Sequence, residues 1–83
     1  MKAKENYEQA CEFDSKGREE EALQFYNLAL KEIDSLNLED QKGLLLGLGS
    51  TYRWVKRFKE SAQVLEDACK KFPDAPEFRV FWR

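Results

Sequence analysis

Hydrophobic residues recur every three or four positions along most of the chain, separated by polar ones. The longest such stripe lies between residues 19 and 36 and contains Ala22, Phe25, Tyr26, Ala29, Leu30 and Ile33. This spacing places apolar side chains on one face of an α-helix, whereas a strand would show strict alternation. The same spacing occurs before residue 15 and on both sides of residues 56–57. The pattern predicts an all-α protein.

Three polar segments separate the first four predicted helices. They lie at residues 15–17, 35–40 and 56–57. The middle segment has Asn37 three residues before Asp40, which is the spacing of a capping box at a helix N-terminus. We therefore expect the second helix to span residues 19–36 and the third helix to begin after Asn37.

A fifth helix is expected to begin shortly before the last residue of the sequence. Pro73 ends a fourth stripe, which contains Phe58, Ala62, Leu65, Ala68, Cys69 and Phe72. Asp74, Pro76 and Glu77 then supply the residue types of an N-cap, a first-turn proline and a third-position acid. The sequence thus predicts about five helices.

The second half of the sequence resembles the first when the two are aligned so that Gly49 falls on Ala10. In this register, which we call the repeat shift, small residues meet small ones and large residues meet large ones: Ala10 with Gly49, Phe13 with Tyr52, Ala22 with Ser61, Tyr26 with Leu65, and Ala29 with Ala68. In stacked helix pairs, small residues let neighbouring backbones approach and large residues fill the remaining gaps. The repeat shift equals a helix-pair unit of about 34 residues plus five, and we expect the five extra residues in a loop at residues 37–41.

With these two copies, the chain resembles the tetratricopeptide repeat family, and in particular its small stand-alone bacterial members. The likeness is carried by residues 13–22 and 44–53, and by the spacing of Leu45, Leu48, Gly49, Tyr52, Ser61, Leu65, Ala68 and Pro73. The resemblance implies antiparallel helix pairs stacked as a short right-handed solenoid. It implies a single domain over residues 1–83, with repeat one at about 3–36, repeat two at about 42–73 and a third pair starting at 74–83.

Four positions depart from the family pattern. Asn6 and Gln9 replace a large residue and a Leu, Asp34 replaces the closing Pro of repeat one, and Lys56 replaces a Gly between the helices of repeat two. We expect these departures to alter the turns more than the fold.

In this family the first helix of each repeat lines a concave groove. The corresponding positions are Lys4, Tyr7, Cys11 and Asp14 in repeat one, and Leu46, Ser50, Arg53 and Trp54 in repeat two. Such a groove would hold an extended or helical segment of a protein partner. The alternative is that Tyr7 and Leu46 only pack one repeat against the next. Some members grip chaperone tails with Lys and Asn residues that are absent here, so that activity is not expected.

The composition excludes several other functions. The 83 residues include 14 basic and 16 acidic residues and no His, for a formal net charge of -2. Without His there is no imidazole base or metal ligand, and we expect no catalytic residue, metal or cofactor. Cys11 and Cys69 lack metal-ligand spacing and are expected to be free thiols. No apolar run has the length of a membrane span or the form of a signal peptide, so a cytoplasmic protein without a membrane partner is expected.

Charge and aromatic residues gather in two places. The stretch from Arg53 to Lys59 mixes both kinds, but a single short cluster in an acidic chain favours a solvated turn with packed Trp54 and Phe58 over nucleic-acid binding. Residues 1–42 have a net charge of -5 and residues 43–83 a net charge of +3. Two explanations are open: a chance distribution of solvated charges, or electrostatic complementarity within or between copies.

Large aromatic residues follow the predicted start of the fifth helix. Phe78, Phe81 and Trp82 recur at helical spacing, where a terminal repeat helix would have a polar outer face. They predict an exposed apolar patch through which two copies associate as a dimer. The rival explanation is that the chain is part of a longer repeat protein.

The sequence therefore favours a non-catalytic protein–protein interaction module that binds a partner in its groove and a second copy at its C-terminal end. One alternative is a three-helix domain that binds helical peptides of the trafficking machinery. The second repeat, which aligns with the first under the repeat shift, argues against this alternative. The other is an enzyme without a His-based site, for which no constellation of catalytic groups is present.

Overall fold

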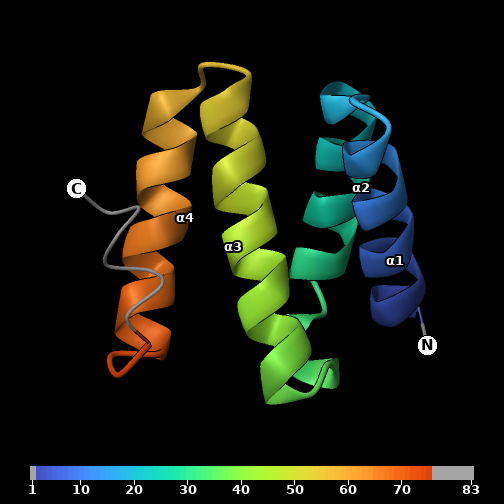
Figure 1. Ribbon diagram of the computed structural model, residues 1–83. Coiled ribbons are helices and arrows are strands. Elements are labelled where there is room, and N and C mark those ends of the chain that lie inside the picture. The colour runs from blue at the N-terminus through green and yellow to red at the C-terminus, as the bar shows by residue number, and fades with distance from the viewer. Residues whose placement is uncertain (1, 76–83) are drawn as a thin grey trace.

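The computed structural model describes residues 2–75, and this part of the chain is helical without strands. Its α-helices are α1 (Lys2–Ser15), α2 (Glu19–Leu30), α3 (Leu38–Trp54) and α4 (Phe58–Lys71), and a short 3-10 helix, η1, spans Ile33–Ser35. Figure 1 shows two antiparallel helix pairs side by side, α1 with α2 and α3 with α4. The all-α prediction is confirmed. About five helices were expected and four α-helices are described; most of the fifth, at 74–83, lies outside the described residues.

The repeat shift reappears in the positions of the helices. α2 begins at Glu19 and α4 at Phe58, while α1 ends at Ser15 and α3 at Trp54, so both boundaries recur in the register that aligns Ala10 with Gly49. The two turns also share their backbone hydrogen bonds. The Arg18 N–H donates to the Phe13 carbonyl at 2.9 Å, and the Arg57 N–H donates to the Tyr52 carbonyl at 2.8 Å. The two copies thus have the same helix–turn–helix geometry.

An arginine next to each of these turns forms the same two interactions, an ion pair and a contact with an aromatic ring. Arg18 pairs with Glu21, and Arg57 pairs with Glu60. Each guanidinium also lies 5.2 Å from the centroid of an aromatic ring, Phe13 in the first turn and Tyr52 in the second. In the second turn, a hydrogen bond from its own backbone N–H and the nearby Arg57 hold the pKa of the Glu60 carboxyl below its ordinary value.

The connection between the repeats differs from the prediction. α2 ends at Leu30 rather than at residue 36, and the chain continues through η1 to Leu36, which is buried in the core and extended in its backbone. The expected loop at 37–41 is also wrong, whereas the expected start of the third helix after Asn37 is confirmed: the Asn37 side chain accepts a hydrogen bond from the Asp40 N–H at 2.8 Å, and α3 begins at Leu38. Burial of Leu36 pulls the chain out of the helix early, and the cap then turns the expected loop into the first turn of α3.

The core is built on small residues between the paired helices. Ala10, Ala22 and Ala29 are fully buried. In the second pair the buried small residue of α4 is Ser61, whose hydroxyl donates to the Gly49 carbonyl at 2.8 Å. Ala62, expected in the core stripe of α4, is instead exposed. Because its hydroxyl is hydrogen-bonded, Ser61 can be buried in the core. The next residue, Ala62, then points towards solvent.

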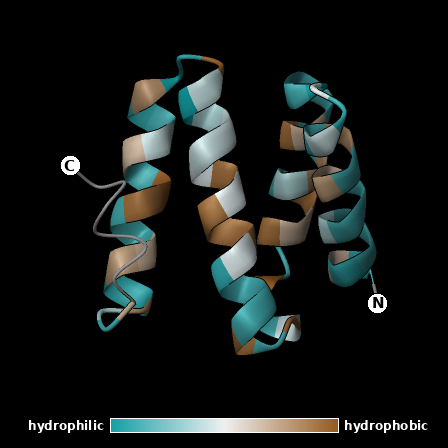
Figure 2. Ribbon diagram, in the orientation of Figure 1, coloured by the Kyte–Doolittle hydropathy of each residue, from teal (hydrophilic) through white to brown (hydrophobic). Residues whose placement is uncertain are grey.

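The helices differ in hydropathy. Figure 2 shows strongly hydrophobic residues on α2, α3 and α4, while α1 is largely hydrophilic. Among the described residues, no helix combines the length and the apolar character needed to cross a membrane.

Candidate functional site

At the N-terminal end of α1, the predicted groove is occupied by contacts within the chain. The Lys4 ammonium lies 3.5 Å from the Asp40 carboxylate on α3. The Tyr7 ring packs against Gly43, where a Cβ atom would overlap the tyrosine hydroxyl. Burial raises the pKa of Tyr7 to about 12. Lys4 and Tyr7 thus join the two repeats at this end.

The middle of the groove holds a cysteine between two tyrosines. The Cys11 thiol lies close enough to the Tyr7 and Tyr26 hydroxyl groups for both to influence its pKa. Tyr26 lies over Gly47, where a Cβ atom would come within 2.7 Å of its hydroxyl oxygen, and that hydroxyl donates to Asp14 at 3.2 Å. Partial burial raises the pKa of the Cys11 thiol, although the residue as a whole is exposed. A thiol with a raised pKa stays protonated at neutral pH and is a poor nucleophile.

Two hollows lie at the C-terminal end of α3, where the predicted groove would end. Trp54, the last residue of that helix, is 74% exposed. A hollow of about 210 Å³ lies where the two repeats meet, and it is lined by Asp14, Glu19, Ser50, Thr51 and Trp54. Predicted groove residues of both repeats, Asp14 from the first and Ser50 and Trp54 from the second, therefore face the same space.

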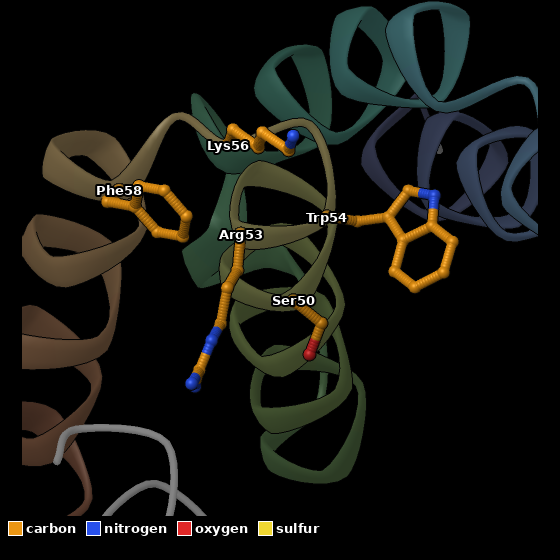
Figure 3. Close-up of a pocket in the computed structure, with 5 residues that line it drawn as sticks. All are labelled: Ser50, Arg53, Trp54, Lys56 and Phe58. Carbon is orange, nitrogen blue, oxygen red and sulfur yellow. The ribbon is translucent and has the colours of Figure 1, made fainter.

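A second, larger hollow adjoins the same tryptophan. It measures about 440 Å³ and is lined by Ser50, Arg53, Trp54, Lys56 and Phe58 (Figure 3). In Figure 3 the Trp54 ring extends towards the first helix pair, whereas Phe58 lies on the side of α4. The expectation that Trp54 and Phe58 are packed in a solvated turn is wrong, because Phe58 is also 60% exposed. Their rings form apolar surface on two sides of the end of α3.

The charged groups beside Trp54 differ between the two hollows. The 210 Å³ hollow has the carboxylates of Asp14 and Glu19, and the 440 Å³ hollow has the cations of Arg53 and Lys56. Within residues 2–75, none of these four side chains forms a salt bridge. The site therefore has opposite, uncompensated charges on its two sides.

Lys56 holds its place in the turn with an unusual backbone conformation. Its φ is 68°, and Gly17, which the repeat shift aligns with it, has a φ of 76° in the first turn. Glycine adopts this left-handed conformation at little cost, whereas residues with a Cβ atom adopt it rarely. The departure from the family pattern at Lys56 thus leaves the turn geometry intact and adds a charged side chain to the hollow.

The remaining predicted site residues lie elsewhere. Leu46 is half-buried against the apolar cluster of Leu45, Leu65 and Ala68. Phe78, Phe81 and Trp82 lie outside the described residues. Sequence reasoning missed the lining role of Glu19, Thr51, Lys56 and Phe58. Of these, only Lys56 had a usable signal, since a lysine stands where the repeat pattern calls for glycine.

The groups around Trp54 can pack against, hydrogen-bond to or form ion pairs with another molecule. The two hollows present aromatic faces, hydroxyl groups, two cations and two carboxylates. In the described part of the chain, no group of three Cys, Asp or Glu side chains is arranged to hold a metal ion.

Comparison with known proteins identifies the repeat. A family model described as tetratrico peptide repeat matches residues 3–78. Comparison with curated proteins and with solved structures gave no match. The matched region covers both helix pairs and the two turns that the repeat shift aligns. The chain therefore belongs to the tetratrico peptide repeat family, whose members typically serve as non-catalytic protein–protein interaction modules.

Proposed function

We propose that the protein is a non-catalytic interaction module that binds a peptide or protein segment around Trp54. The observation that carries the proposal is that Trp54 is 74% exposed and lines two hollows. Burying such a ring in a complex removes a large apolar area from water, at about 25 cal/mol for each Å². Exposed aromatic surface with a polar rim is typical of a binding site for another protein.

The polar neighbours of Trp54 suit this role. Arg53 and Trp54 belong to the residue types that most often dominate the free energy of protein association. Asp14 is held in place by the hydrogen bond from Tyr26, and Ser50 lines both hollows. Lys4, Tyr7, Cys11 and Leu46 take a supporting part in the proposal, because they keep the two repeats in position beside the site.

A second part of the proposal is self-association. We propose that two copies pair through Phe78, Phe81 and Trp82, on the strength of their aromatic side chains and helical spacing in the sequence. These three residues lie outside the described residues. Neither a nucleic acid nor a membrane is part of the proposed function.

The binding proposal is tested with a random peptide library displayed on phage and selected on the purified protein. Synthetic copies of the selected peptides are titrated against the protein, Trp54→Ala and Leu38→Ala by fluorescence anisotropy. Leu38 is a matched control, because it is 65% exposed at the opposite end of the same helix. We expect Trp54→Ala to weaken binding about tenfold or more and Leu38→Ala to leave it unchanged. Selected peptides that bind Trp54→Ala as tightly as the original protein would show that the site is misplaced.

A further inference from the structure

The charges around Trp54 are arranged with a direction. Asp14 and Glu19 lie in the hollow on the side of the first helix pair, and Arg53 and Lys56 line the hollow on the other side. Trp54 and Ser50 belong to both. A segment that crosses Trp54 therefore meets carboxylates at one end and cations at the other.

These charges are available to a partner. The arginines next to the two turns are compensated within the chain, Arg18 by Glu21 and Arg57 by Glu60. Within the described residues, by contrast, Glu19, Arg53 and Lys56 have no oppositely charged side chain within salt-bridge distance. Asp14 accepts a hydrogen bond from the neutral Tyr26 hydroxyl, which positions its carboxylate without neutralising it.

The conformation of Lys56 is an independent sign that its side chain matters. The first turn satisfies the same backbone geometry with Gly17. A lysine at this φ is strained, and strained residues that persist tend to occur at functional sites. The strained residue lines the 440 Å³ hollow together with Trp54 and Phe58 (Figure 3).

We propose that the segment bound at this site has a large apolar residue between a basic end and an acidic end. The apolar residue packs on Trp54 and Phe58, the acidic end meets Arg53 and Lys56, and the basic end meets Asp14 and Glu19. This inference rests on the proposed function and adds the chemistry and the direction of the ligand. A uniformly charged segment would bring like charges together in one of the two hollows, which disfavours it.

The probes that test the inference are labelled nine-residue peptides with a central Leu. Two have a pair of Lys on one side of the Leu and a pair of Asp on the other, in the two possible chain orders. A third has the same composition with the charges alternating, and a fourth has only Asp. We expect one of the first two to bind about fivefold or more tightly than the third and fourth at low salt. The preference should shrink at high salt, since the charges are exposed.

Exchanging the charges then tests which end of the peptide contacts Lys56. Lys56→Glu should weaken binding of the preferred peptide. Replacing the Asp pair of that peptide by Lys should restore its binding to the variant. Lys59→Glu is the matched control, because Lys59 is an exposed cation close by in the chain that lines neither hollow. It should have little effect at moderate salt. Circular dichroism and thermal unfolding of each variant verify that the fold is unchanged.

The outcomes distinguish failure of the charge-directed inference from failure of the proposed binding site. If the alternating or all-acidic peptide binds as well as the preferred one, or if charge exchange restores nothing, the inference is wrong while Trp54-dependent binding stands. If none of the four peptides binds, the inference is also wrong, and the library-selected peptides still test the proposed site. If Trp54→Ala leaves the binding of every peptide unchanged, the proposed site is wrong and the inference falls with it.

Discussion

Gly17 and Lys56 occupy the same place in the two turns, with φ values of 76° and 68°. At this φ the Cβ atom of an L-residue crowds the following carbonyl, at a cost of roughly 1–2 kcal/mol. The second turn therefore gives up stability that the first turn retains. In return it carries a cation at the edge of the Trp54 site.

Lys56→Gly should stabilise the protein. The variant relieves the strained φ, and the greater freedom of glycine in the unfolded chain offsets part of the gain, so we expect the free energy of unfolding to rise by about 0.5–1 kcal/mol. Urea and thermal unfolding measure this change. The reverse experiment is Gly17→Ala, which should cost about 1 kcal/mol. The nearest atom to a Cβ atom there is 4.0 Å away, so the loss reports on φ and not on a clash. A destabilised Lys56→Gly variant would contradict this account.

Tyr7 should make stability depend on pH in alkaline solution. Burial raises its pKa from 10.0 to about 12 in the folded protein. Between these values the unfolded chain has released the proton and the folded chain still holds it, so the free energy of unfolding falls as the pH rises from 10 to 12. Tyr7→Phe removes this contribution, and its stability should fall less steeply over the same range. Urea unfolding at a series of pH values tests the prediction; parallel slopes for the two proteins would show that Tyr7 ionises equally easily in both states.

At the scale of the elements, hydrophobic spacing predicted the helix pairs well and their ends less well. The turns after Ser15 and after Trp54 fell where polar residues indicated them. The end of α2 did not, because the burial of Leu36 is a tertiary contact that periodicity within one helix does not contain.

The candidate site was predicted in part, for a similar reason. Asp14, Ser50, Arg53 and Trp54 follow from the resemblance to the repeat family, whose groove positions they occupy. Phe58 was assigned to the core stripe from its spacing to Ala62 and Leu65. It is the first residue of α4 and is 60% exposed, which the spacing of hydrophobic residues does not reveal.

The contact between the repeats depends on the absence of a side chain at Gly47. A Cβ atom there would lie 2.7 Å from the hydroxyl oxygen of Tyr26, a residue that is only 2% exposed. Gly47→Ala should therefore destabilise the protein by about 1–2 kcal/mol, despite the better helix propensity of Ala. Tyr26→Phe removes the clashing oxygen, so Gly47→Ala should cost clearly less in that background. Urea unfolding of the four proteins completes the double-mutant cycle; strictly additive losses would mean that the two residues do not meet.

At the scale of the whole molecule, the uneven charge of the sequence reappears at one site. The half with a net charge of -5 supplies Asp14 and Glu19, and the half with a net charge of +3 supplies Arg53 and Lys56. The site lies where the two repeats meet, so it depends on the stacking of both. Its lining residues therefore come from segments that are far apart in the sequence.

Self-association also belongs to this scale. We expect light scattering at micromolar concentration to give twice the mass of the 83-residue chain. Replacing Phe81 and Trp82 by Ser should yield a monomer, because the apolar contact between copies is lost. Trp54→Ala should remain a dimer, since it leaves Phe78, Phe81 and Trp82 unchanged. A monomeric original protein would remove self-association from the proposed function.

Binding of a partner segment around Trp54 can be followed residue by residue through amide NMR shifts during titration with a selected peptide. We predict that the largest shifts fall on residues 14–19 and 50–58, together with the Trp54 indole N–H, and that Trp54→Ala removes them. Shifts centred on the other end of α3, near Leu38, or spread evenly over the chain, would contradict the account.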